Sequence, residues 1–292
     1  MHYNEIKQGY FIARPNRFIV HVELDGQVEV CHVKNTGRCR ELLTPRAVVY
    51  VECHHDPRRK TKYSLIAVRK GSMLINMDSQ APNKVVGEWL ASGELLPGLT
   101  LLKPECRYGA SRFDFYAETQ QQRMFIEVKG VTLEENGVAM FPDAPTERGI
   151  KHLDELAQAV RDGYAATVIF VIQMRGVTSF TPNRRTHAAF AEALQRAQQA
   201  GVQVLAYDCD VTSDGLSFGK ADSLLFLNWD ICYIKNPSAV PASRAGGSIG
   251  AVQLKKNGAD YESLYEILYY AEGRESRPQR PSMGLCRGNN QY

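Results

Sequence analysis

The sequence lacks the marks of a membrane-embedded, secreted or disulfide-stabilised protein. No apolar run approaches the roughly 18 residues that cross a bilayer, and the opening MHYNE has no apolar core behind a basic start, as a signal peptide would. Its seven cysteines are an odd set without a C-x-x-C pair, a pattern typical of a reducing compartment and not of a disulfide framework or a zinc ribbon. We therefore expect a cytoplasmic protein with no membrane partner.

Several ligand-binding motifs are missing as well. Neither common Gly-rich nucleotide-binding loop is present, and no recognition-helix motif for reading DNA sequence occurs. Cys53-His54-His55 has no second ligand pair, which argues against a zinc site. What remains is an ordinary globular composition, with 44% apolar and 23% charged residues in 292 residues, enough for two domains and unlike a disordered chain.

Residues 1–80 are predicted to form a small β-barrel. Two β-rich runs, 18–24 and 28–33, flank Asp25-Gly26, a strong hairpin signal because both positions tolerate positive φ. Shorter strands are expected at 47–53, 62–68 and 73–77. About five short strands without a long helix indicate a barrel of the oligonucleotide-binding (OB) type.

Residues 81–222 are predicted to form an α/β domain with a mixed sheet. The pattern predicts helices at 84–92, 147–162 with Thr146 as N-cap, and 186–200, and strands at 113–117, 124–131, 167–173 and 202–207. Their order, helix, hairpin, helix, strand, helix, strand, is typical of such a domain.

Residues 223–292 are predicted to be a C-terminal extension. Residues 236–250 are rich in Pro, Ser, Ala and Gly, as a linker is. Residues 260–271 form a weak amphipathic helix pattern, and 276–292 have a composition that favours disorder.

Charge differs between the first two regions. Residues 1–80 hold 13 Lys and Arg against 8 Asp and Glu, a balance of +5, whereas residues 81–222 hold 14 against 18, a balance of −4. A basic module that holds nucleic acid, joined to an acidic module that binds metal, would show this pattern. On these totals alone, ordinary fluctuation in charge is the favoured explanation.

The most informative segment is Glu127-Val128-Lys129, preceded by Asp114. Strand alternation puts Glu127 and Lys129 on one face, and a hairpin can bring Asp114 beside them. The two carboxylates offer the oxygen ligands that Mg²⁺ or Mn²⁺ prefers, and Lys129 can stabilise charge on a phosphate or position the attacking water. An isolated E-x-K is usually a surface ion pair. The preceding Asp, the helical Glu88 and the apolar flanks favour a site.

These parts, in this order, resemble the core of the PD-(D/E)xK nucleases, in which a helical acid, an Asp and an E-x-K gather around a metal. The matching residues are Glu88, Asp114, Glu127 and Lys129. Arg112-Phe113-Asp114 stands where that family often has Pro-Asp. The resemblance implies that Glu88, Asp114 and Glu127 hold the metal.

The predicted helix after the E-x-K strand carries Arg148, Lys151 and His152 in its first turns. Arg148 and His152 share a face at i, i+4, and Lys151 lies beside them. Close to a metal this face would bind the scissile phosphate or stabilise the leaving group. The alternative is a solvated face on which Glu147 pairs with Lys151.

Three basic loops of the predicted barrel supply candidate nucleic-acid contacts. They contain Arg17, then Lys34, Asn35, Thr36 and Arg38, and finally Arg59 and Lys60. The Asn35-Thr36-Gly37-Arg38 loop could hold a phosphate through backbone amides and the guanidinium. Any one basic loop is usually only solvated, but three on one small barrel favour a surface that follows phosphates without reading sequence.

Long ungapped motifs narrow the assignment. The run FPDAPTERGIKHL at 141–153, with KNTGR at 34–38, NMDSQAPN at 76–83, SRFDF at 111–115 and EVKGVTL at 127–133, closely resembles the sugar fermentation stimulation protein family over about residues 3–220. The resemblance implies an OB-like N-terminal domain, a nuclease-like second domain, non-specific DNA binding and a link to regulation of sugar (maltose) metabolism. Residues 223–292 have no counterpart in that family.

Together these patterns predict a DNA-binding, Mg²⁺- or Mn²⁺-dependent nuclease that hydrolyses phosphodiester bonds in DNA, with RNA as a further candidate substrate, and with little sequence specificity. The alternative is a non-catalytic DNA-binding regulator linked to sugar metabolism, whose signature would be a broken set of catalytic residues. Asp114, Glu127 and Lys129 are all intact, which favours the enzyme.

Overall fold

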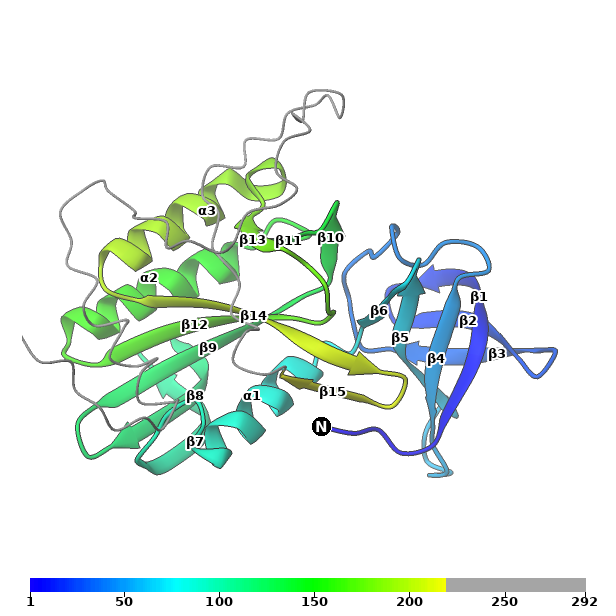
Figure 1. Ribbon diagram of the computed structural model, residues 1–292, viewed down its shortest axis with the longest axis horizontal. Coiled ribbons are helices and arrows are strands. Elements are labelled where there is room, and N and C mark those ends of the chain that lie inside the picture. Colours follow the sequence, from blue (N-terminus) through cyan, green and yellow to red (C-terminus); the bar gives the residue numbers. More distant parts are fainter. Residues whose placement is uncertain (219–292) are drawn as a thin grey trace, which may run out of the picture. The chain divides into compact units, whose positions relative to one another are not determined.

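The first five strands close into a barrel, and the sixth pairs with the fifth; they are coloured blue to cyan in Figure 1. Their order in the sheet is β3-β2-β1-β4-β5-β6, and a parallel pairing of β3 with β5 closes it. The strands are β1 (Ile6–Asn16), β2 (Ile19–Leu24), β3 (Gln27–Val33), β4 (Val48–Cys53), β5 (Tyr63–Lys70) and β6 (Met73–Asn76). Asp25 and Gly26 join β2 to β3 with φ of 52° and 80°, so the predicted hairpin and the OB-like barrel are confirmed.

The sequence patterns missed β1, the strand that pairs with both β2 and β4. Its register against β2 shifts twice, a sign of bulges that curve the strand. A Cβ on Gly9 would overlap the side chains of Leu24 and Val22. Glycine at this position therefore lets β1 cross the barrel closely.

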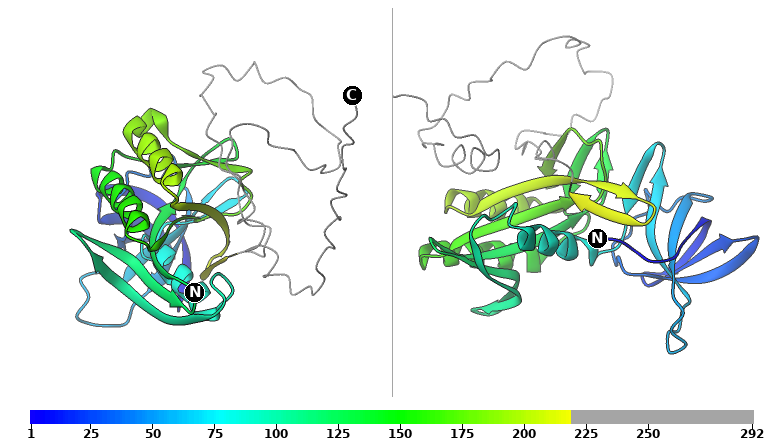
Figure 2. Two further views of the ribbon diagram at one scale, coloured as in Figure 1. Left: turned by 90° about the vertical axis from the view of Figure 1, so that its left-hand side faces the viewer. Right: turned by 60° about the horizontal axis from the view of Figure 1, so that its bottom comes forward.

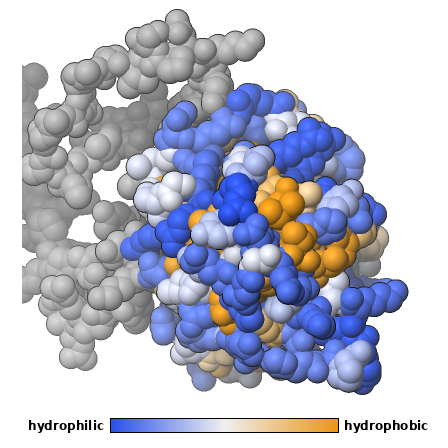
Figure 3. Space-filling view, turned by 90° about the vertical axis from the view of Figure 1, so that its right-hand side faces the viewer, coloured by the Kyte–Doolittle hydropathy of each residue, from blue (hydrophilic) through white to orange (hydrophobic). Residues whose placement is uncertain are grey.

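The barrel carries an apolar outer face (Figure 3). Within residues 1–218, the large apolar side chains that remain exposed all belong to β1, β3 and the turn before β2: Tyr10, Ile12, Phe18, Val28 and Val30. The Arg46 guanidinium lies 4.5 Å from the centre of the Tyr10 ring and also pairs with Glu23. Arg17 likewise lies 4.8 Å from the centre of the Phe18 ring, so cations pack against the aromatic rings of this face.

The second sheet has the order β15-β14-β12-β9-β8-β7. Its strands are β7 (Leu99–Tyr108), β8 (Ser111–Thr119), β9 (Arg123–Val131), β12 (Ala165–Ile172), β14 (Gln203–Thr212) and β15 (Gly215–Phe218). β9, β12 and β14 run parallel, while β7, β8 and β15 are antiparallel to their neighbours. This confirms the predicted mixed sheet.

Helices cover both faces of this sheet. They are α1 (Ala81–Ser92), α2 (Glu147–Arg161) and α3 (Arg184–Gln199). Figures 1 and 2 show α2 and α3 side by side on one face and α1 on the other. Two apolar clusters match this layering: one fills the barrel and the space under α2 and α3, and the other lies under α1. Thr146 caps α2 by accepting a hydrogen bond from Gly149 N at 3.1 Å, as its position before the helix predicts.

A small third sheet, unforeseen from the sequence, adjoins the carboxyl end of β9. It consists of β10 (Leu133–Glu135), β11 (Val138–Phe141) and β13 (Ser179–Pro182), in the order β10-β11-β13. β10 begins two residues after β9 ends, so the chain passes directly from the E-x-K strand into this sheet.

A buried polar network joins the end of the barrel to β12. Gln173 Nε2 donates to Asn76 Oδ1 at 2.9 Å and to the Asp78 carbonyl at 3.0 Å. Lys34 Nζ pairs with Asp78 Oδ2 at 2.6 Å, and the Tyr3 hydroxyl donates to the same oxygen at 3.3 Å. Asp78 is fully buried, so these contacts compensate a charge that would otherwise be costly.

This computed structural model describes residues 1–218, which belong to one compact unit, Met1–Tyr233. The predicted extension at 223–292, with its linker and helix, lies outside the described residues. Among residues 1–218, no helix is long and apolar enough to cross a membrane, and the five cysteines in this range are free thiols.

Candidate functional site

In strand β8, the alternation of side chains between the two faces of the sheet is interrupted at Asp114. Pairing of β8 with β9 runs from Phe115–Ile126 to Glu118–Arg123, so Asp114 lies just beyond it. Phe113 packs in the cluster under α2, whereas Phe115 packs in the cluster under α1, although a regular strand would send both to one face. The Asp114 side chain bridges the irregularity, because its Oδ2 accepts a hydrogen bond from Val128 N at 2.7 Å.

Glu127 lies at the centre of the site and is 3% exposed. Its Oε1 accepts hydrogen bonds from Lys129 Nζ at 2.5 Å and from His152 Nδ1 at 2.6 Å. Its Oε2 is buried and has no hydrogen-bond partner in the described part of the chain. One oxygen of this carboxylate is therefore doubly held, and the other is available to a ligand.

His152 is oriented from both sides. Arg148 Nε lies 3.3 Å from His152 Nε2, and a guanidinium can only donate. We therefore assign the hydrogen of the ring to Nδ1, from which it is donated to Glu127 Oε1. Arg148, His152 and Glu127 thus form a chain of hydrogen bonds.

The two carboxyl groups have opposite electrostatic environments. Burial raises the pKa of Asp114 above its ordinary value, and the neighbouring Glu127 carboxylate raises it further, against hydrogen bonds from Val128 and Asn83. Burial alone would raise the pKa of Glu127, but the hydrogen bond from His152 and the charge of Lys129 outweigh it and lower that pKa. Environments that push the pKa values of two neighbouring acids apart are typical of catalytic sites, although structural ion pairs produce them too.

The structure does not bring Glu88 to this cluster. Glu88 is 57% exposed and pairs with the amino group of Met1 at 2.8 Å. The α1 side chain that reaches the site is Asn83, whose Nδ2 donates to Asp114 Oδ1 at 2.6 Å. Five residues along a helix place Asn83 and Glu88 about 140° apart, so only one of them can face Asp114. An amide in the first turn of α1 carried no sequence signal of its own.

Lys151 does not take part in the hydrogen bonds that join Arg148, His152 and Glu127. Its Nζ donates to the Ala110 carbonyl at 3.3 Å, in the turn before β8, and lies 3.9 Å from Glu155 Oε1. Glu147 contacts His187 at 3.2 Å, so the Glu147–Lys151 pair of the solvated-face alternative is not the contact that forms.

The basic residues of the barrel divide into paired and exposed groups. Lys34 is engaged with Asp78, and Arg59 donates to Ser64 Oγ at 3.1 Å while remaining an exposed residue. Arg17 lies 4.8 Å from the centre of the Phe18 ring. Arg38 and Lys60 are exposed. Lys34 is thus the least suited of the predicted phosphate contacts.

Arg14, which the sequence patterns missed, shapes the loop at 35–38. Its guanidinium donates to four backbone carbonyls, those of Arg17, Asn35, Gly37 and Arg38, at 2.7–2.9 Å. Because a trans peptide points its N–H opposite to its C=O, the amides of Thr36 and Arg38 point away from Arg14. Asn35 Oδ1 accepts the hydrogen bond from Gly37 N at 2.8 Å.

The carboxylates of β8 and β9 supply some, but not all, of the oxygen ligands that a hard divalent cation needs. Within residues 1–218, no three His, Cys, Asp or Glu side chains are grouped as metal ligands. Asp114 and the unpartnered Glu127 Oε2 form a two-carboxylate set, which is enough for an ion that keeps waters and substrate oxygens as its other ligands. Glu155 Oε2 is also buried without a partner in the described residues, but it is Glu127 that lies close enough to Asp114 to raise the pKa of that carboxyl group.

Comparison with protein families gives two matches that follow one another along the chain. Residues 12–77 match the SfsA N-terminal OB domain, and residues 80–215 match the sugar fermentation stimulation protein RE domain.

Individual relatives agree with these matches. The sugar fermentation stimulation protein homolog of Ruminiclostridium cellulolyticum is 60% identical over 220 residues, which is 75% of this chain and 97% of the relative. The homolog of Clostridium beijerinckii is 58% identical, over 74% of this chain and 96% of the relative. Among solved structures, Pyrococcus furiosus SfsA in complex with Ca²⁺ matches with a TM-score of 0.71 and 28% identity, over 78% of this chain and 98% of that one.

Proposed function

The chain belongs to the sugar fermentation stimulation protein family, and from that premise we propose that it is a DNA-binding, metal-dependent nuclease. The observation that carries this proposal is the buried, unpartnered Glu127 Oε2 beside Asp114. A buried carboxylate oxygen without a partner is costly, and a divalent cation would compensate it. The relative from Pyrococcus furiosus, solved with Ca²⁺, supports a cation with oxygen ligands.

Asp114 and Glu127 would hold Mg²⁺ or Mn²⁺. The bound ion supplies Lewis acidity, which polarises the phosphodiester and makes a water nucleophilic near neutral pH. Lys129 orients Glu127 and offers a positive charge to the phosphate, while His152 fixes the other side of the same oxygen. Arg148 is exposed and offers its remaining N–H groups to phosphate oxygens. Asn83 holds Asp114 in place.

The barrel would supply non-specific affinity for DNA. Its balance of +5 and the exposed Arg17, Arg38, Arg59 and Lys60 support contacts to phosphates, which carry no sequence information. RNA offers the same phosphates and is a further candidate substrate. The match of residues 12–77 to an OB domain supports a nucleic-acid-binding role for this part of the chain.

The test is cleavage of labelled single- and double-stranded DNA and RNA by purified protein, with Mg²⁺, Mn²⁺ or EDTA. We expect cleavage with either metal and none with EDTA. Glu127→Gln preserves the shape of the side chain but removes its charge, and Glu88→Gln serves as a matched control outside the cluster. Binding without cleavage by the wild-type protein would favour the non-catalytic regulator instead.

A further inference from the structure

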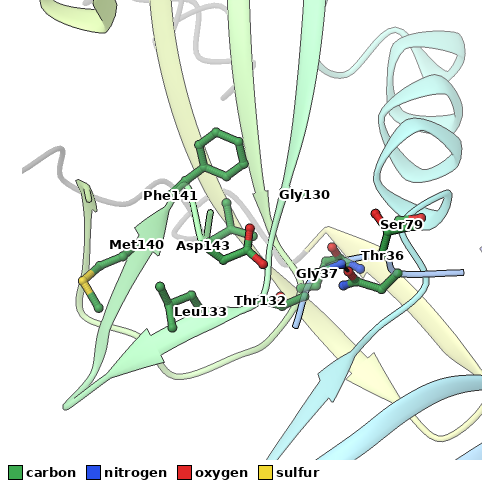
Figure 4. A pocket seen from close by; sticks show the side chains of 12 residues that line it. Thr36, Gly37, Ser79, Gly130, Thr132, Leu133, Met140, Phe141 and Asp143 are labelled. Carbon is green, nitrogen blue, oxygen red and sulfur yellow. Dashed lines mark hydrogen bonds between the residues drawn. The ribbon is translucent and has the colours of Figure 1, made fainter. Parts of the chain in front are cut away.

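A pocket of about 190 Å³ lies where the barrel loop at 35–38 approaches the carboxyl ends of β9 and β12 (Figure 4). Its volume is about six times the roughly 30 Å³ that each molecule has in liquid water. It has room for one ring-sized group. Its polar lining includes Asn35, Thr36, Ser79, Thr132 and Asp143.

The Asp143 carboxylate marks the chemistry of this pocket. Within residues 1–218 it makes no hydrogen bond or ion pair, and Figure 4 shows it between the β11 side and the barrel loop. A Cβ on Gly37 would come within 2.5 Å of Asp143 Oδ2, so glycine at 37 permits this close approach. Arg14 fixes the loop that carries Gly37.

The remaining lining decides which ligand fits. No lysine, arginine or histidine of the described chain lines the pocket, so no cation of the lining offsets the repulsion between a phosphate group and Asp143. Asn35 uses its Oδ1 for Gly37 N, which leaves its amide nitrogen as a donor. Leu133, Met140 and Phe141 form an apolar wall. The pocket therefore suits a flat, uncharged ring that donates N–H groups and accepts one hydrogen bond.

The position of the pocket connects it to the candidate active site. Gly130 and Thr132 line it and follow Lys129 on the same strand and its continuation. At about 3.3 Å per strand residue, Gly130 lies about 10 Å along β9 from Glu127. A nucleic-acid strand whose phosphate lies at Glu127 and Lys129 would therefore bring a neighbouring nucleotide to the pocket.

We propose that this pocket binds an unpaired nucleobase that carries an exocyclic amino group, next to the phosphate that is cut. The inference rests on the proposed nuclease function. Asp143 accepts from the amino group, as acidic side chains do from N4 of cytosine, and the Asn35 amide donates to the ring. Thymine presents O4 in place of that amino group, and two acceptors then oppose each other. Because the base must leave any duplex to enter, the substrate is single-stranded or locally unpaired.

The test is equilibrium binding of short single-stranded oligo-dC and oligo-dT, which share one sugar-phosphate backbone. Measurements use Ca²⁺ and, separately, EDTA, so that binding is read without relying on turnover. We expect the wild-type protein to prefer oligo-dC by at least about fivefold. Asp143→Ala should abolish the preference and Gly37→Ala, which displaces the carboxylate, should reduce it. Asp154→Ala, a change at an exposed aspartate of α2, should leave it intact.

Equal affinity of the wild-type protein for the two oligomers would overturn the inference, as would a preference that survives Asp143→Ala. Cleavage with Mg²⁺ is scored separately. Cleavage without a preference for oligo-dC would support the proposed nuclease function and overturn the base-binding role of the pocket. A preference for oligo-dC that depends on Asp143, without any cleavage, would support the base-binding role and overturn the nuclease function.

Discussion

The cluster around Glu127 and the basic loops of the barrel are both polar, but they are built in opposite ways. Around Glu127 the side chains of Asp114, Lys129 and His152 are buried or half-buried, and each is held by a named partner, such as Asn83 for Asp114. In the barrel, Arg38 and Lys60 are exposed. Preorganised groups act on charge that develops in one transition state, whereas exposed cations share a diffuse phosphate attraction. Single changes should therefore be severe in the first region and mild in the second.

The sharpest test of this contrast is Glu127→Gln. The amide retains the shape and can still accept from His152, but it loses the charge that attracts a cation. We expect metal-dependent cleavage to fall by at least about a hundredfold, with DNA affinity within a few-fold of wild type. Cleavage rates and fluorescence-anisotropy binding measure the two quantities. Near-normal cleavage would remove Glu127 from the active site.

A second test separates two residues that had the same predicted role. Lys34→Ala leaves the buried Asp78 carboxylate without its ion-pair partner and should cost about 3 kcal/mol of unfolding free energy, the low end for buried pairs because Lys34 is 16% exposed. Lys60→Ala, at an exposed position, should change it by less than about 0.5 kcal/mol. Urea denaturation of both variants measures the difference. If both variants lower the unfolding free energy by the same small amount, groups other than Lys34 compensate the buried charge of Asp78.

A third test concerns the contribution of α1. Asn83→Ala removes a donor to Asp114 and should reduce metal affinity or cleavage by about 10- to 100-fold, as changes at residues that orient metal ligands do. Glu88→Gln, on the same helix, should leave both within a few-fold. Metal titrations of cleavage provide the measurement. If Glu88→Gln has the larger effect, the helical acid implied by the nuclease resemblance is the true ligand.

The mildest expected change is in the barrel. Replacing Arg38, Arg59 and Lys60 together by Ala should reduce the slope of log K against log salt by about two to three units, since each phosphate contact contributes about 0.7 to 0.9. Cleavage at saturating DNA should be unchanged. Salt titrations with two unrelated oligonucleotides measure the slope. An unchanged slope would move the phosphate contacts to the second domain, near Arg148 and Lys151.

Local patterns predicted the elements whose own residues carry a strong signal. The β2–β3 hairpin, the capped α2 and the buried β12 are all read from adjacent residues. β1 pairs with the neighbouring β2 but was missed because Gly9 and Pro15 weaken its strand pattern. β10 and β11 pair locally but have only three and four residues, and the four-residue β13 pairs with the distant β11.

The same distinction holds in the candidate site. Alternation placed Glu127 and Lys129 on one face, and helical spacing brought Arg148 to His152. Asn83, Arg14 and Asp143 were missed because each acts on a residue at least 20 positions away, through hydrogen bonds or close packing that no sequence spacing encodes. Glu88 matched the order of a motif, but order along the chain does not determine which face of a helix meets the sheet.

The four carbonyls held by Arg14 also make the loop at 35–38 a convenient site for engineering. Its shape is fixed through backbone groups, so the exposed side chains at Thr36 and Arg38 contribute little to maintaining it. A library randomised at these two positions would vary the chemistry beside the pocket while the scaffold stays folded. Arg14 and Gly37 would have to remain constant in such a library, because one anchors the loop and the other leaves room for Asp143.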